Sequence, residues 1–278
     1  MKLDGGAMFG NAPKALWQKW VAVDDLNMID IESRSLLVET PNHKILFETG
    51  AGAYLSPEMK NRFQVVEDNH VLLDSLIDIG LAHEEITHII LSHLHFDHAG
   101  GILKEFQDDR KPIELLFPNA KLITGRTQFK RSASPHIRDR ASFIPQLDRL
   151  LIESGRLELK SDQDIMNFDD LEIRLMESHG HTPGMLLSQI QVKDLKILFL
   201  GDIAPGHPWI NLPITMGYDR NPELLVDEKT KFFKTALQDE AWIFFTHDFE
   251  YAASKLLYDD EKKRFVPDKL LREFNIEV

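Results

Sequence analysis

The sequence contains no cysteine among its 278 residues. This absence excludes disulfide bonds, thiolate nucleophiles and cysteine-based zinc sites. Any metal ion that the protein binds must therefore be held by nitrogen and oxygen ligands.

Basic residues are scarce relative to acidic ones. The chain has 32 Lys and Arg against 45 Asp and Glu, which gives a formal net charge of -13. Nucleic-acid binding requires a positive surface that neutralises phosphates, so this balance disfavours it. We expect a small-molecule partner that is neutral.

Long apolar runs are also missing. The longest, "LLVET", "THIILS" and "LKILFLGDIA", have the length of strands and fall well short of the roughly 20 residues that span a bilayer. The opening "MKLDGGAMFGNAPK" lacks the apolar stretch and cleavage site of a signal peptide. We therefore expect no membrane contact and a cytoplasmic protein.

Strand and helix patterns mix along the whole chain, which indicates an α/β or α+β protein. A hairpin is expected over residues 34–52, a helix over 71–81 and a buried strand over 85–92. Later segments repeat these patterns: strands at 120–125 and 171–178, a hairpin over 185–202 that turns at Lys193 and Asp194, a helix over 222–240 and a strand over 241–248. No composition break divides residues 1–278, so we expect one domain, with an N-terminal arm at about 1–30 and a lid insertion at about 130–146.

Three of the twelve histidines and an aspartate lie within six positions of "SHLHFDHAGG", at 92–101. In an extended segment His93, His95 and Asp97 share one face, and a turn at Asp97 and His98 brings His98 round to them. Imidazole and carboxylate suit zinc and related divalent metals, and two ions can share such a patch if other loops complete the coordination. The alternative is that these histidines lie on the surface by chance, but nothing in such an arrangement would require this spacing.

Further donors follow other expected strands. "SHGHTPG" at 178–184 offers His179 and His181, while Asp202 and His247 each follow an apolar run. Taken alone, Asp202 could be a turn residue and His247 a buried histidine with satisfied hydrogen bonds. Together with the cluster, they predict a metal site assembled at strand ends.

The motifs "SHLHFDHAGG", "GHTPG", "LGD" and "FTHD", in this order, resemble the metallo-β-lactamase superfamily over about residues 30–250. The resemblance implies a four-layer αββα sandwich, with two mixed β-sheets flanked by helices. It also implies two divalent metal ions, with zinc expected first and manganese, iron or cobalt as alternatives. The implied ligands are His93, His95 and His181 for the first ion, Asp97, His98 and His247 for the second, and Asp202 as a bridge.

Within the family, His95 stands where flavodiiron oxygen reductases carry glutamate, so the resemblance favours hydrolysis over redox chemistry. Persulfide dioxygenases remain a minor alternative. Phe96, the opening "DGGAMFG" and residues 201–223 resemble the quorum-quenching N-acyl homoserine lactonase branch and its methyl parathion hydrolase relatives. Three features depart from the family pattern: Met185 replaces a histidine, Glu48 replaces an aspartate, and the first tyrosine after Asp202 is as distant as Tyr218.

The expected function is hydrolysis of an ester or lactone, such as an N-acyl homoserine lactone. Two ions that share a water lower its pKa from about 15.7 towards about 7, which gives a hydroxide able to attack the carbonyl. Asp202 would bridge the ions and Asp97 would pass the proton to the leaving alkoxide. The alternatives are a phosphotriesterase-like or broad aryl esterase activity and a non-catalytic metal-binding scaffold.

The expected substrate pocket is apolar. Its candidate residues are Phe96, Met8, Phe9, Trp17, His207 and Tyr218. The segment from Met8 to Trp17 fits a packed N-terminal arm equally well, and an oxyanion role for Tyr218 stays open. Such an arm is also a candidate to exchange contacts in a homodimer, which the resemblance to this branch favours.

Overall fold

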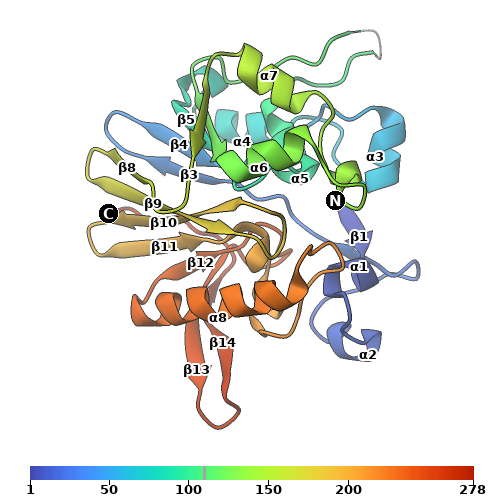
Figure 1. Ribbon diagram of the computed structural model, residues 1–278, viewed down its shortest axis with the longest axis vertical. Helices are drawn as coiled ribbons and strands as arrows, with labels where there is room; N and C mark the ends of the chain where they lie inside the picture. Colours follow the sequence, from blue (N-terminus) through green and yellow to red (C-terminus); the bar gives the residue numbers. More distant parts are fainter. Residues whose placement is uncertain (109–110) are drawn as a thin grey trace. The chain divides into compact units, whose positions relative to one another are not determined.

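The computed structural model describes residues 1–108 and 111–278, and the chain divides into two compact units (Figure 1). Unit 1 consists of Met1 and Ser33–Ser161, and unit 2 of Lys2–Glu32 and Asp162–Val278. Within the described residues, no helix has both the length and the apolar character needed to cross a membrane. Whether residues 1–278 act as the single expected domain stays a prediction.

Unit 1 is built on a five-stranded mixed sheet with the order β3-β4-β5-β6-β7. Its strands are β3 (Leu36–Glu39), β4 (Lys44–Phe47), β5 (His88–Ile90), β6 (Lys121–Gly125) and β7 (Leu157–Lys160). Strands β3 and β4 form the hairpin expected over 34–52, and the other neighbours run parallel. Parallel neighbours bring the ends of β4 and β5 to one edge of the sheet, where the chain continues into Glu48 and into the histidine cluster.

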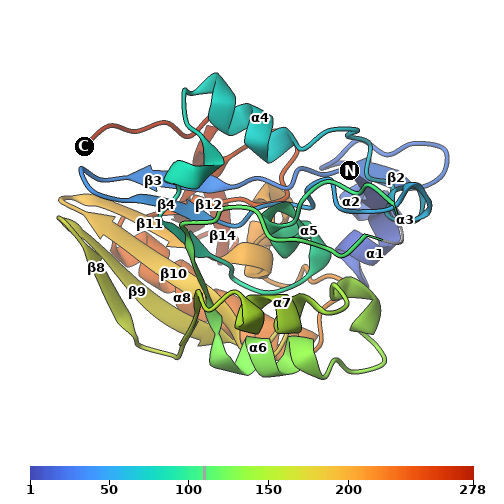
Figure 2. The same cartoon turned by 90° about the horizontal axis from the view of Figure 1, so that it is seen from above.

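The helices of unit 1 are short. They are α3 (Pro57–Phe63), α4 (Val71–Asp78), α5 (Phe96–Ala99), α6 (Arg126–Ala133) and α7 (Leu147–Glu153), with 3-10 turns η1 (His83–Glu85), η2 (Gly100–Ile102) and η3 (Arg140–Ser142). Helix α4 confirms the helix expected over 71–81. Figure 2 shows α6 and α7 side by side.

The stretch 130–146 begins inside α6 and is tied together by an ion pair. Arg131 donates two hydrogen bonds to Asp139 Oδ2, at 3.0 and 2.7 Å, and the Asp139 side chain is buried. A forked guanidinium bond of this kind fixes orientation as well as distance. Its expected role as a lid stays a prediction.

Unit 2 contains a seven-stranded sheet with the order β14-β13-β12-β11-β10-β9-β8. Its strands are β8 (Ile165–Phe168), β9 (Leu171–Ser178), β10 (Met185–Val192), β11 (Leu195–Phe199), β12 (Trp242–Phe244), β13 (Ala253–Asp259) and β14 (Arg264–Leu271). Only the β11–β12 pair is parallel among these described strands. The predicted hairpin turn is confirmed, since β10 and β11 are joined through Lys193, whose φ of 50° is in the left-handed region. The edge strand β14 contains Pro267 and is displaced against β13 by an irregularity in register.

The N-terminal segment of unit 2 forms a two-stranded ribbon and two helical turns. Strands β1 (Lys2–Asp4) and β2 (Met28–Asp30) pair antiparallel, with α1 (Gly5–Phe9) and α2 (Lys14–Trp17) between them. The ring of Phe9 stacks on Trp17 at 5.2 Å and on Trp209 at 4.6 Å between centroids. Trp209 belongs to the 3-10 turn η5 (His207–Ile210), and its indole N–H donates to the carbonyl of Met8.

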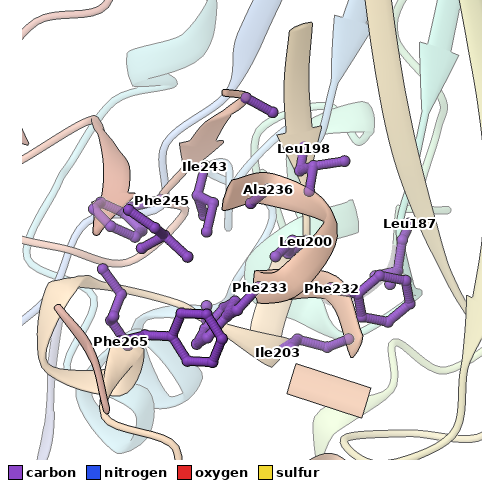
Figure 3. Close-up of a cluster of buried hydrophobic side chains, with 14 of the residues drawn as sticks. Leu187, Leu198, Leu200, Ile203, Phe232, Phe233, Ala236, Ile243, Phe245 and Phe265 are labelled. Carbon is purple, nitrogen blue, oxygen red and sulfur yellow. The ribbon is translucent and has the colours of Figure 1, made fainter. Parts of the chain in front are cut away.

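Helix α8 (Pro222–Gln238) packs its apolar face on the sheet of unit 2 (Figure 3). Proline at its first position is well placed, because that residue needs no hydrogen-bond donor. Apolar side chains recur at helical spacing and face the strands. The cluster includes Leu187, Leu198, Leu200, Leu225, Phe232, Phe233, Ala236, Ile243 and Phe245. Full burial of each large side chain contributes about 1.5–3 kcal/mol, so this interface anchors α8 firmly.

Candidate metal centre

In unit 1, the histidine cluster follows β5 directly. His93, His95 and His98 are all buried, with ring centroids 4.4 Å apart for His93 and His95 and 3.9 Å apart for His93 and His98. The expected extended alternation holds only as far as His95. Ala99 N–H bonds to the His95 carbonyl at 2.9 Å, which starts α5, so Asp97 lies on a helical turn instead of an extended face.

Residues at the end of β4 fix this cluster. Glu48, which follows β4 with a φ of 61°, accepts the Ser92 N–H at 2.9 Å through Oε1, and the same oxygen lies 3.7 Å from His98 Nδ1. Thr49 donates both its N–H and its hydroxyl to the carbonyl of His98, at 2.9 and 2.8 Å. Glu48, His93 and His98 each offer one donor atom, and these atoms lie within 4.8 Å of one another. Glu48, which replaces the aspartate of the family pattern, thus supports the histidine cluster through these contacts.

In unit 2, a carboxylate stands between two imidazoles. Asp202, in the 3-10 turn η4 (Gly201–Ile203), has Oδ2 at 3.3 Å from His181 Nε2 and Oδ1 at 3.1 Å from His247 Nε2. All three side chains are buried. His179, the competing candidate, is exposed, and its Nδ1 accepts the N–H of Gly184 at 3.0 Å. The structure therefore gathers His181, and not His179, with Asp202 and His247.

The outer nitrogens of the two imidazoles are held by polar groups. His181 Nδ1 lies 2.8 Å from Asp219 Oδ1, and His247 Nδ1 lies 2.7 Å from the carbonyl of Glu32. Acceptors at both Nδ1 atoms place the ring proton there and leave the Nε2 lone pairs facing Asp202. Asp219 also accepts the N–H of Met216 at 2.6 Å and is fully buried. Sequence reasoning missed Asp219, which has no local motif around it.

In each unit, the chemistry of the donor residues fits a divalent metal ion. Each unit presents buried imidazole nitrogens together with carboxylate oxygens, the ligand set that zinc and neighbouring metals prefer. Oriented Nδ1 atoms are typical of metal-binding histidines, because the outer hydrogen bond fixes both tautomer and ring direction.

A cavity of about 410 Å³ lies within unit 1, beside the cluster. Phe96 lines it and stacks on Phe63 with centroids 4.3 Å apart, while Phe143 meets the ring of His95 at 4.8 Å. Tyr54 also lines it, and burial together with the nearby charge of Asp97 raises the pKa of its phenol. The cavity is thus largely aromatic on the side next to the histidines.

The other candidates for a substrate pocket lie elsewhere. Met8, Phe9 and Trp17 are almost fully buried in unit 2, which is the packed-arm arrangement. His207 bonds to Asp248 through both its backbone N–H and its Nδ1, each at 2.7 Å from Oδ2. Together with His247 it lines a smaller cavity of about 130 Å³ in unit 2. Tyr218 is about 41% exposed.

The known proteins that are similar to the chain include three hydrolases. A probable metal-dependent hydrolase from Staphylococcus aureus superposes with a TM-score of 0.84 at 26% identity, covering 99% of this chain and 94% of that one. An N-acyl homoserine lactonase of a Bacillus species is 23% identical over 80% of this chain and 84% of its own length. The human acyl-coenzyme A thioesterase MBLAC2 is 27% identical over 60% of this chain and 57% of its own length.

The sequence profile of the metallo-beta-lactamase superfamily matches residues 30–247. This range contains every residue that the sequence indicated as a metal ligand, and the mixed sheets with their helices agree with the predicted fold class. The chain belongs to the metallo-beta-lactamase superfamily and has its fold.

Proposed function

We propose that this metal-dependent hydrolase opens the lactone ring of N-acyl homoserine lactones at a dinuclear metal centre. The observation that carries the proposal is the position of Asp202, whose two oxygens each face the Nε2 atom of a different buried histidine. A carboxylate placed in this way can bind two ions at once, one through each oxygen. A site for a single ion would not need this arrangement.

The proposed ligands are the seven residues that the sequence indicated. They are His93, His95 and His181 for one ion, Asp97, His98 and His247 for the other, and Asp202 for both. The clustering of the donors within each unit supports this assignment, as do their order along the chain and the family to which the chain belongs. Zinc is the proposed metal, because nitrogen and oxygen donors without thiolate suit it.

Two bound divalent ions would lower the pKa of a water molecule and polarise a substrate carbonyl. The protein's own residues supply the remaining functions. Asp97 has a side chain that is 15% exposed, in contrast to the buried histidines around it, so it can reach a leaving alkoxide and pass a proton to it. Asp202 lies between the imidazoles of His181 and His247, with one carboxylate oxygen near the Nε2 atom of each.

The aromatic cavity of unit 1 is the proposed site for the acyl chain. Its lining includes the apolar side chains of Phe96, Phe63, Phe143 and Met59, and Phe96 adjoins Asp97 in the sequence. Charged side chains also line it, among them Lys104, Glu105, Lys111 and Glu114. The apolar part of the lining can bind an aliphatic chain through burial of its surface. The relatives named as a lactonase and a thioesterase act on substrates that contain an acyl group, which supports the same assignment.

The proposal is tested by acid release from N-decanoyl homoserine lactone, followed by titration at constant pH with zinc-loaded protein. We expect rapid release that is lost in His98→Ala. Turnover of decanoyl coenzyme A, aryl esters or a phosphotriester in preference to the lactone would replace the proposed substrate with one of those classes. Absence of release from protein shown to hold metal contradicts the lactonase proposal.

A further inference from the structure

The loop that delivers His181 is tied to helix α8 by a carboxylate outside the proposed ligand set. Glu228 Oε1 accepts the backbone N–H of His179 at 2.8 Å, while Oε2 accepts the N–H of Gly180 at 3.0 Å and the hydroxyl of Ser178 at 2.6 Å. Three consecutive residues therefore donate to one carboxylate. Hydrogen bonds to an ionised acceptor are about twice as strong as neutral ones, so this contact holds the loop tightly.

The loop also lies directly against α8. A Cβ atom added at Gly180 would come within 2.6 Å of the Cα atom of Leu225, so only glycine allows this approach. At the start of α8, Asn221 donates its backbone N–H to the carbonyl of Gly180 at 2.8 Å and its side-chain amide to the carbonyl of His179 at 2.9 Å. The N–H groups and the carbonyls of this loop are thus both fixed from one helix.

Lys229, which follows Glu228 in α8, fixes the segment that leads to Asp219, the hydrogen-bond partner of His181. Lys229 is fully buried and donates to the carbonyls of Trp209 and Ile214, at 3.0 Å in the case of Trp209. The chain runs from there to Asp219, which holds His181 Nδ1. Two adjacent residues of α8 therefore anchor, respectively, the backbone of the histidine loop and the segment that carries its hydrogen-bond partner.

We propose that Glu228 is a positioning residue for His181, acting through the backbone of residues 178–180. The inference rests on the proposed function, because it takes His181 as a ligand of one of two metal ions. Glu228 does not contact the ligand side chain in this arrangement. It determines where the loop places the imidazole, and therefore how well one of the two sites binds its ion.

The test compares wild type with Glu228→Gln for zinc affinity at each site, measured by competition with a chelator. In glutamine an NH2 group replaces one of the two carboxylate oxygens. This group would face at least one of the three hydrogen-bond donors that now bind Glu228, so the loop must shift. We expect the dissociation constant of one zinc ion to rise about 10-fold to 100-fold, as for loss of other outer partners of metal ligands. The second zinc ion should keep its wild-type affinity.

Asp227→Asn is the matched control, because Asp227 is an exposed neighbour on α8 and its substitution removes the same charge. Ser178→Ala removes one of the three hydrogen bonds and should shift the same site by a smaller factor, which provides a result even if Glu228→Gln folds poorly. Unchanged affinities, or an equal loss at both sites, overturn the positioning role. Wild-type protein that binds only one zinc ion overturns the dinuclear centre itself and removes the basis of the inference.

Discussion

Lys229 is a lysine whose side-chain nitrogen has no access to water. Its side chain is fully buried, and its nitrogen donates to two backbone carbonyls. Burial lowers its pKa to about 7, against a smaller opposing effect of the charge on Asp219. A neutral amine has two N–H donors, which matches the two carbonyls that it meets.

This pKa predicts a specific dependence of stability on pH. Between about pH 7 and the unfolded-state pKa near 10.5, the unfolded chain binds the Lys229 proton more tightly than the folded protein does, so the free energy of unfolding rises with pH. Relative to Lys229→Met, metal-free wild-type protein should gain up to about 1.4 kcal/mol per pH unit between pH 8 and 9. Urea unfolding at several pH values measures this difference.

Lys234→Met serves as the control, since Lys234 is exposed on the same helix. Its free energy of unfolding should follow that of wild type across the range. If the Lys229→Met curve runs parallel to wild type as well, the lysine is charged in the folded protein, and the lowered pKa is wrong.

The metal donors could be predicted from the sequence because most of them fall in short motifs after apolar strands. Asp219 and Glu228 could not be, because they act across 38 and about 50 positions in the sequence. Such partners have no local pattern; only the folded chain brings them to the loop of His181. The choice of His181 over His179 came from the family resemblance, and burial distinguishes the two in the structure.

At the scale of elements, the turn after α5 depends on glycine. A Cβ atom at Gly101 would lie 2.0 Å from the carbonyl oxygen of Thr49, which is backbone and cannot move aside cheaply. Gly101 N–H also bonds to the carbonyl of Gly50 at 2.9 Å. Because Thr49 donates to the carbonyl of His98, any shift here also displaces a proposed ligand.

Gly101→Ala should therefore lower the free energy of unfolding by about 3 kcal/mol, the upper part of the usual range for overpacking. Zinc affinity should fall in the same variant. Gly6→Ala, in α1, is the control, because its new methyl group would meet only side-chain atoms, those of Asp4 at 3.0 Å and Asn27 at 3.7 Å, and no backbone. Thermal or urea unfolding of both variants checks the prediction, and equal stability would show that the turn tolerates a side chain.

Elements with a clear period were predictable. Hairpins alternate apolar and polar residues around turn residues, and α8 shows a helical repeat over 17 residues. Helix α5 was not predicted, since it has only four residues and a single turn leaves no period to detect. The formation of α5 changes the directions in which the side chains of Asp97 and His98 point. It does not change which residues belong to the histidine cluster.

At the scale of the whole molecule, the charge of -13 should separate neutral from anionic substrates. Coenzyme A thioesters carry several phosphate charges, whereas a homoserine lactone has none. Raising the ionic strength from about 0.01 M to about 0.15 M shortens the Debye length from about 30 Å to about 8 Å and screens the repulsion. Affinity for decanoyl coenzyme A, as substrate or inhibitor, should rise several-fold with salt, while that for N-decanoyl homoserine lactone stays nearly constant.

Steady-state kinetics at both salt concentrations make this comparison with the same acyl chain on each compound. A decline in affinity for the thioester with salt would indicate a basic patch that attracts phosphates in spite of the acidic composition. That result would favour the thioesterase alternative.

The last strand of the large sheet limits how this protein can associate. An open sheet edge is a template on which another chain can add a strand, and this is a common start of aggregation. In β14, Pro267 cannot donate a backbone hydrogen bond, and Lys269 has a φ of 51°, which interrupts the regular strand backbone. The protein should therefore resist polymerising through this edge when concentrated, and a continuous sheet that grows from β14 should not form.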